Sequence, residues 1–212
     1  MPLKVNEIFY SIQGESSYAG LPCVFIRLTG CNLRCSYCDT KYTYTEGEDL
    51  EFAEIIQKTL PYQCSLIEIT GGEPLIQKET PFLIHRLLES GYKVLLETNG
   101  SQDISKIDER CVRIVDIKCP SSREEAQNDL ANLTRLTEKD EIKFVIGDRV
   151  DYEYAKNILH KNTIKAHHIH FSPVFGKLKL DDLVRWILKD SLNVRLQVQA
   201  HKIIWGLEQK GV

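Results

Sequence analysis

Hydrophobic and polar positions divide this chain into short apolar runs and amphipathic segments. Residues 5–9 alternate between apolar and polar side chains, which predicts a strand, and the apolar run 23–28 predicts a second, buried strand. Apolar residues recur at a helical spacing over residues 50–60, and Pro61 ends that pattern. Further strands are predicted at 66–70, 93–97, 112–117, 141–146, 168–171 and 193–198, and further helices at 81–90, 122–136, 151–159 and 179–189.

This order of elements predicts an α/β fold. Strands that alternate with helices of about ten residues form right-handed βαβ units and a mostly parallel sheet. About eight strands with fewer helices indicate a sheet that curls into an incomplete βα barrel. Polar motifs follow six of the predicted strands at their carboxyl ends, where such folds gather their chemistry, at 31–38, 71–74, 97–100, 118, 172–173 and 199–202.

The composition is that of an ordinary globular protein, and 212 residues are expected to form one domain, residues 1–212. A net charge of −3 gives no electrostatic reason to expect nucleic-acid binding. No apolar run reaches the roughly 18 residues of a membrane span, and the first residues lack the apolar core of a signal peptide. We therefore expect a cytoplasmic protein without a membrane partner. The seven cysteines do not have the spacing of a secreted disulfide framework.

Three of these cysteines lie within eight residues, at Cys31, Cys35 and Cys38, directly after the second predicted strand. Thiolates select zinc, copper(I) or iron–sulfur clusters. A closed zinc site needs four ligands, and no fourth Cys or His lies nearby in the sequence. A four-iron cluster normally takes four cysteines, so a cluster held by three has one iron open for a substrate or cofactor.

The spacing Cys31-x3-Cys35-x-Tyr37-Cys38 resembles the signature of radical S-adenosylmethionine (SAM) enzymes. This resemblance implies that the three thiolates hold a 4Fe–4S cluster, Cys38 also meeting SAM, and that the amino and carboxylate groups of SAM bind the fourth iron. The segment 70–74, which contains Gly-Gly-Glu-Pro, supports the resemblance because a similar motif contacts the SAM amino group in that family. The residues that it implies around SAM are Tyr37, Cys38, Asp39, Gly72, Glu73, Asp116, Ile117, Lys118 and Ser172.

Four further segments, 8–15, 25–33, 38–40 and 197–202, look like those of the 7-carboxy-7-deazaguanine synthase family. That family converts 6-carboxy-5,6,7,8-tetrahydropterin to 7-carboxy-7-deazaguanine with loss of ammonia, regenerates SAM and requires magnesium. The resemblance implies an external electron donor, a homodimer and a magnesium ligand at Thr40. It implies proton movements at Glu15 and Glu97, and substrate contacts from Ile12, Gln13, Gly14, Arg27, Thr70 and His201. The family often closes its pocket with the terminal residue, here Val212.

Several of these residues have structural alternatives. Arg27 could be an outward-facing charge on a strand, and Thr40 could be a local cap. Glu97 and Lys118 could form a structural pair. His168 and His170 share a strand face, which permits a metal but is more often structural, and Trp186 and Trp205 are expected in the core or at a dimer interface. Two other functions are also compatible with the cysteine loop: a glycyl-radical activating enzyme, and a non-catalytic iron–sulfur or zinc-binding module.

Overall fold

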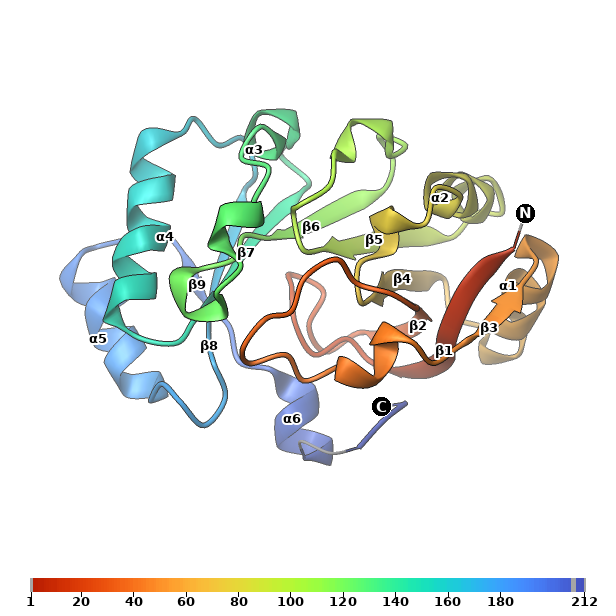
Figure 1. Ribbon diagram of the computed structural model, residues 1–212, viewed down its shortest axis with the longest axis horizontal. Helices are drawn as coiled ribbons and strands as arrows, with labels where there is room; N and C mark the ends of the chain where they lie inside the picture. The colour runs from red at the N-terminus through yellow and green to blue at the C-terminus, as the bar shows by residue number, and fades with distance from the viewer. Residues whose placement is uncertain (1, 207–208, 212) are drawn as a thin grey trace.

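One mixed sheet runs through the part of the chain that the computed structural model describes, residues 2–206 and 209–211. Its nine strands have the order β3-β1-β2-β4-β5-β6-β7-β8-β9 (Figure 1). β1 (Leu3–Ile12) pairs antiparallel with β2 (Pro22–Leu28) and with β3 (Glu48–Leu50). From β2 onward every pairing is parallel, through β4 (Leu66–Gly71), β5 (Lys93–Thr98), β6 (Val112–Asp116), β7 (Glu141–Ile146), β8 (His168–Pro173) and β9 (Arg195–Leu196).

The sheet curls without closing, since β3 and β9 stand at its two ends. This confirms the predicted partial barrel with a mostly parallel sheet. In chain order the helices are α1 (Phe52–Thr59), α2 (Thr80–Glu89), α3 (Asn132–Arg135), α4 (Arg149–Lys161), α5 (Leu180–Lys189) and α6 (Ala200–Trp205). The first five lie around the outside of the curve, whereas α6 packs against the turn after β1 (Figure 1).

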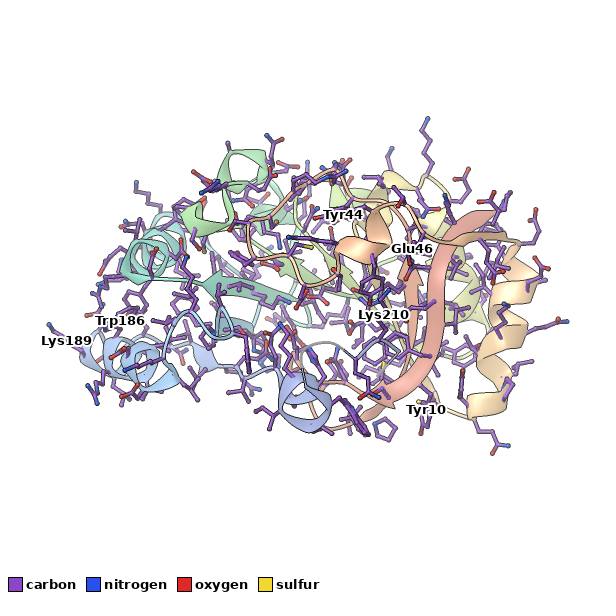
Figure 2. The ribbon with its side chains drawn as sticks, turned by 60° about the horizontal axis from the view of Figure 1, so that its bottom comes forward. Tyr10, Tyr44, Glu46, Trp186, Lys189 and Lys210 are labelled. Carbon is purple, nitrogen blue, oxygen red and sulfur yellow. The ribbon has the colours of Figure 1, made fainter. Side chains whose placement is uncertain are left out.

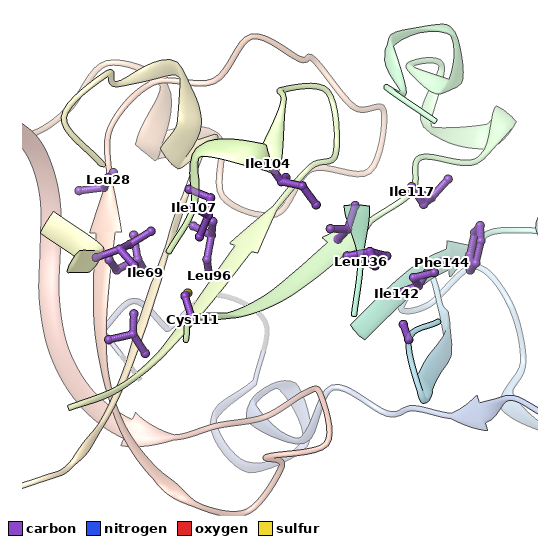
Figure 3. Packing of buried hydrophobic residues seen from close by; sticks show 14 of the residues in the cluster. Leu28, Ile69, Leu96, Ile104, Ile107, Cys111, Ile117, Leu136, Ile142 and Phe144 are labelled. Atoms are coloured by element: carbon purple, nitrogen blue, oxygen red, sulfur yellow. The ribbon is translucent and has the colours of Figure 1, made fainter. Parts of the chain in front are cut away.

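The two faces of the sheet differ in polarity because alternate side chains of a strand point to opposite faces. The outer face carries apolar side chains that pack against the helices, and Figure 3 shows part of this core, including Ile69, Leu96 and Phe144. The inner face carries a small apolar cluster around Phe25 and Leu95, and toward the carboxyl ends it becomes polar. A buried polar face of this kind is suited to hold a polar ligand.

The long helix predicted over residues 122–136 is wrong. Two short 3-10 turns, Pro120–Ser122 and Glu125–Gln127, replace most of it, and only α3 remains α-helical. Ser121 does not cap a helix there: its hydroxyl and backbone N–H donate to Asp151. The segment instead turns its backbone toward the cysteine loop, where the carbonyl oxygens of residues 121 and 122 accept hydrogen bonds from Ser36. In a helix these carbonyls would accept hydrogen bonds from backbone N–H groups of the helix itself.

Other elements agree with the predictions except at their ends. β3 and α6 were not predicted, and β9 is shorter than the strand expected at 193–198. Trp186 packs against the core and its ring contacts Tyr152, whereas Trp205 is exposed. Within the described ranges, the structure has no helix both long and apolar enough to cross a membrane.

A buried ion pair connects β6 to the turn before β7. Asp140 is fully buried and accepts hydrogen bonds from the backbone N–H and Nε of Arg113, at 2.9 and 3.2 Å, and from the backbone N–H and hydroxyl of Thr137. Burial raises the pKa of this carboxyl, but the hydrogen bonds from Arg113 outweigh that effect and lower it. The ionised Asp140 carboxylate therefore stabilises the fold at pH values above the ordinary carboxyl pKa. This stabilisation is lost as the pH falls through the lowered pKa of Asp140.

We predict that Asp140→Ala lowers the free energy of unfolding by about 3–5 kcal/mol, because it leaves the buried Arg113 without its counter-ion. Denaturant unfolding at neutral pH measures this effect. The matched control is Asp181→Ala, which removes an exposed partner of Arg185 on α5 and should change stability by less than about 0.5 kcal/mol. Similar losses in both variants would contradict the assignment of Asp140 as the structural anchor.

Candidate active site

A cleft of about 640 Å³ opens inside the curl at the carboxyl ends of the strands. Five of the six predicted polar strand ends contribute to its lining; the sixth, 172–173, does so only through the adjacent Val174 and Phe175. The lining includes most of the predicted site residues: Ile12, Gln13, Gly14, Glu15, Arg27, Cys31, Cys35, Tyr37, Cys38, Asp39, Thr40, Thr70, Gly72, Glu97, Asp116, Lys118 and His201.

The cysteine loop is held in place mainly by backbone groups. Ser36 donates its N–H to the carbonyl of Ser122, at 3.0 Å, and its hydroxyl to the carbonyl of Ser121, at 2.6 Å. Arg34 donates to the carbonyl of Cys31, at 2.8 Å, and its guanidinium lies over the ring of Tyr44. Because these contacts come from both sides of the loop, its three thiols face the cleft in one arrangement.

The three thiols form a donor set that suits a cluster with one open iron. Cys31, Cys35 and Cys38 are free, partly exposed and line the same cleft. The backbone N–H of Leu33 and the amide of Asn99 point at the Cys31 sulfur, at 3.4 and 3.8 Å. Among the described residues, no group of three or more His, Cys, Asp or Glu side chains converges on a single metal ion. A cluster is larger than an ion, so its ligands need not meet at one point.

The Gly-Gly-Glu motif after β4 supports the cysteine loop. A side chain at Gly72 would collide with the backbone of Gly30 and with Cys31, so only glycine allows this close approach. Glu73 is fully buried, and its carboxylate accepts hydrogen bonds from the hydroxyl of Thr98 and the backbone N–H groups of Asn99 and Leu75. Glu73 is not among the residues that line the cleft, and its contact with the SAM ammonium stays a prediction.

One wall of the cleft is formed by Tyr37, Asp116 and Lys118. The Lys118 ammonium pairs with Asp116, at 2.8 Å, rather than with Glu97 as the structural alternative had it. The other Asp116 oxygen and the Tyr37 hydroxyl are buried without a hydrogen-bond partner among the described residues. Buried polar atoms are normally paired, so these two are candidates for ligand contacts.

Ile117 and Ser172 do not line the cleft. The side chain of Ile117 is fully buried in the apolar core outside the sheet, so only its backbone could serve a ligand. The Ser172 hydroxyl is buried and has no hydrogen-bond partner among the described residues. Their predicted contacts with SAM therefore have no direct support from the cleft's geometry.

Arg27 points into the cleft and is not an outward-facing charge. Its Nε donates to Glu7, at 2.7 Å, and its guanidinium lies over the ring of Phe9. Among the described residues no second acceptor contacts the guanidinium, so its terminal nitrogens remain available to a ligand. Thr40 also lines the cleft, and its hydroxyl caps no helix but lies 3.7 Å from the Cys38 sulfur.

The end of β1 and the turn that follows it bring Ile12, Gln13, Gly14 and Glu15 to the cleft. Gln13 donates from its amide to Glu68, and the carbonyl of Gly14 accepts from the backbone N–H of α6, so closely that a side chain at Gly14 would collide with His201. Burial lowers the pKa of His201. Glu15 pairs with the Lys143 ammonium, at 2.8 Å.

α6 and the residues before it cover this turn. Gln199 donates to Glu15, at 2.8 Å, and Lys202 forms an ion pair with Asp39. The segment therefore links the turn after β1 to the end of the cysteine loop. Further on, Lys210 lies 3.8 Å from Glu46 and above the ring of Tyr42, and Figure 2 shows Lys210 near Glu46. Val212, the proposed closing residue, lies outside the described residues.

His170 is structural in this fold. Its Nε2 lies 2.7 Å from Glu141, both side chains are buried, and Glu141 also accepts from the N–H and hydroxyl of Ser17. This contact ties the turn after β1 to the sheet. His168 lies on the same face, with its ring 6.3 Å from that of His170.

The cleft residues that were not predicted as site residues include Glu68, Asn99, Lys143, Gln199 and Lys202. Glu68 is the single charge in its strand, which is the same signal that identified Arg27. Lys143 shares β7 with Glu141, so that signal does not single it out. Asn99, Gln199 and Lys202 belong to predicted polar strand ends, which is the signal that could have found them.

Comparisons with known proteins agree with this geometry. Residues 25–188 match the model of the Radical SAM superfamily. Among solved structures, QueE from Escherichia coli is similar with a TM-score of 0.73 and 24% sequence identity, over 95% of each chain. SuiB from Streptococcus suis bound to S-adenosylmethionine is similar with a TM-score of 0.55 and 17% identity, over 80% of this chain and 48% of that one. These structures share the fold.

Sequence relatives extend the similarity over the whole chain. A 7-carboxy-7-deazaguanine synthase of Koribacter versatilis (strain Ellin345) is 46% identical over 230 residues, which cover 99% of this chain and 100% of that protein. The protein of the same name from Chlorobaculum tepidum is 43% identical and covers 100% of this chain and 98% of its own. The chain therefore belongs to the radical SAM superfamily and, within it, to the family of 7-carboxy-7-deazaguanine synthases.

Proposed function

We propose that this chain converts 6-carboxy-5,6,7,8-tetrahydropterin to 7-carboxy-7-deazaguanine and ammonia. The observation that carries this proposal is the end-to-end similarity to proteins named for that product. The cleft supports it, because three cysteines, an arginine and a cluster of ionisable groups line the same cavity.

Membership of the radical SAM superfamily implies a 4Fe–4S cluster and SAM as cofactors. When bound, the cluster supplies the electron that cleaves SAM. Cys31, Cys35 and Cys38 would hold it, and the electron itself comes from an external donor. Tyr37, Asp39, Gly72, Glu73 and Asp116 to Lys118 would surround SAM. The unpaired Tyr37 hydroxyl and Asp116 oxygen support this placement on one wall of the cleft.

Other residues that line the cleft suit the pterin. The free end of the Arg27 guanidinium can bind the substrate carboxylate in a bidentate manner. Ile12 to Gly14, Thr70 and His201 would hold the ring, with Glu15 and Glu97 accepting protons or hydrogen bonds from it. Ordered side chains on rigid strand ends favour one orientation of the substrate, which is how such a site lowers a barrier.

Two further parts of the proposal concern magnesium and assembly. Thr40 would ligate Mg²⁺ through its hydroxyl, a hard oxygen donor suited to a hard cation, and its exposure to the cleft supports this. We also propose a homodimer. Exposed apolar side chains on α6, at Ile203, Ile204 and Trp205, support a partner at this edge of the sheet.

The experiment that tests the proposed function is an anaerobic assay with reduced, cluster-loaded protein, SAM and the carboxypterin. We expect the deazaguanine chromophore and an equal amount of ammonia, and slower formation of both in the presence of a magnesium chelator. Neither should form from a pterin that lacks the carboxylate. Absence of product while the protein forms a glycyl radical on a partner would favour the activating-enzyme alternative.

The cysteine assignment predicts a selective loss of iron. Cys31→Ala, Cys35→Ala and Cys38→Ala should each bind little iron and sulfide after anaerobic reconstitution, because each removes one of three cluster ligands. The matched control is Cys64→Ala, whose thiol donates to the carbonyl of Pro22 outside the cleft and should leave the iron content unchanged. Wild-type iron in any of the first three variants, or uptake of zinc alone by the wild type, would refute the cluster.

The arginine assignment predicts a loss of affinity that depends on the substrate carboxylate. Arg27→Lys should weaken carboxypterin binding by about tenfold or more, since a point charge replaces a bidentate fork. Isothermal titration measures this with SAM present and no reductant. Affinity for a pterin without the carboxylate should barely change, and Arg185→Lys on the surface of α5 should change neither. Equal losses for both pterins would show that Arg27 does not bind the carboxylate.

A further inference from the structure

Lys143 occupies the centre of the ionisable groups inside the sheet. It stands in the middle of β7, its side chain is 7% exposed, and its ammonium lies 2.8 Å from Glu15. The same ammonium donates to Glu97 and lies 3.9 Å from Asp116. Three carboxylates from three parts of the chain thus meet at one lysine.

Among the described residues, Lys143 is the cation that donates hydrogen bonds to both Glu15 and Glu97. Asp116 already has Lys118 as its partner, and His170 on β8 already pairs with Glu141. Burial lowers the pKa of His201, the other base that faces Glu15. The other titratable side chains on the elements around the pair are Glu68 on β4, Asp116 on β6, Lys118 just after β6, Glu141 on β7, His170 on β8 and His201 on α6.

Lys143 controls which of these carboxyls are charged. Burial raises the pKa of Glu15, but the Lys143 ammonium, with help from His201 and Gln199, lowers it to about 2. Glu68 makes no hydrogen bond to Lys143 among the described residues. Its burial, together with the nearby carboxylates of Glu97 and Glu15, raises the pKa of Glu68 well above the ordinary value. Without Lys143, the partly buried Glu15 and Glu97 would be two like charges without their shared counter-ion, and the Coulombic attraction that most lowers the pKa of Glu15 would be lost.

The chemistry of the proposed substrate explains why two ionised carboxylates would be useful beside Lys143. A tetrahydropterin has several ring and amino N–H groups, and ionised carboxylates are the strongest acceptors that a protein can offer to them. A protonated carboxyl would present a donor where an acceptor is needed.

Resting on the proposed function, we propose that Lys143 is a positioning residue, whose ammonium holds the Glu15 and Glu97 carboxylates together as paired hydrogen-bond acceptors for the N–H groups of the reduced pterin. Lys143 itself needs no contact with the substrate. It acts by fixing the place and the charge of the two groups that do.

The test compares pH profiles of wild type, Lys143→Met and Lys143→Arg. Two quantities are measured: kcat/KM for product formation, and carboxypterin affinity by calorimetry with SAM present and no reductant. In Lys143→Met, both should fall on the acid side at a pH at least one unit higher than in the wild type, because Glu15 loses the ammonium that lowers its pKa and takes up a proton more readily. Lys143→Arg keeps the charge and should restore the wild-type acid limb even if its maximal rate is lower.

The matched control is Lys156→Met, which removes a lysine paired with Asp190 on the surface and should leave both profiles unchanged. If Lys143→Met does not fold, the Glu97→Gln/Lys143→Met double variant replaces it, and its acid limb should lie above that of Glu97→Gln alone. An unshifted acid limb in Lys143→Met, or in the double variant where that replaces it, overturns the proposal, as do equal losses at every pH in Lys143→Met and Lys143→Arg. Wild-type protein that forms no product refutes the proposed function instead, and the binding profiles still decide the role of Lys143.

Discussion

Pairing of buried charge is the constraint on which this structure depends. The apolar core lies outside the sheet and under the helices, so the inner face is free to carry polar groups. Charges withdrawn from water are tolerated only when they are paired and hydrogen-bonded. The inner face satisfies this rule with four pairs that join separate elements, Arg27–Glu7, Lys143–Glu15, Lys143–Glu97 and His170–Glu141, and with the local pair Lys118–Asp116 at the end of β6. The same pairs that make the interior stable also define the shape and charge of the cleft.

The cysteine loop depends on a second set of contacts, made by backbone rather than by charge. The carbonyls of residues 121 and 122 hold the loop from one side, and the Gly71-Gly72-Glu73 turn packs against its first residues from the other. The two chain segments that hold the loop lie close in sequence to residues that line the cleft. The thiols, the proposed SAM wall and the pterin floor are therefore fixed relative to one another by short stretches of chain. A reaction that involves a cluster, SAM and a substrate requires all three to be held in fixed relative positions.

Much of this arrangement follows from sequence pattern. Alternating strands and helices specify a parallel sheet, and parallel strands bring their carboxyl ends to one edge, which is why polar motifs far apart in sequence meet in the cleft. The helix expected at 122–136 failed because local periodicity carries no information about backbone carbonyls needed by the cysteine loop 85 residues away. Glu68 was overlooked although it is a lone charge in an apolar strand, as Arg27 is, whereas Lys143 shares its strand with Glu141. Their partners arrive from distant parts of the chain, and only the folded structure shows that the charges are paired.

The function that we propose implies that this cleft uses SAM repeatedly while it rearranges a small pterin. The measurement that tests this is the ratio of deazaguanine formed to SAM consumed during anaerobic turnover with excess reductant. We expect many molecules of product for each SAM lost, with one ammonia released per product. A ratio of one product for each SAM consumed, with equal release of 5′-deoxyadenosine, would show that SAM is not renewed. Consumption of SAM without any deazaguanine would refute the proposed function.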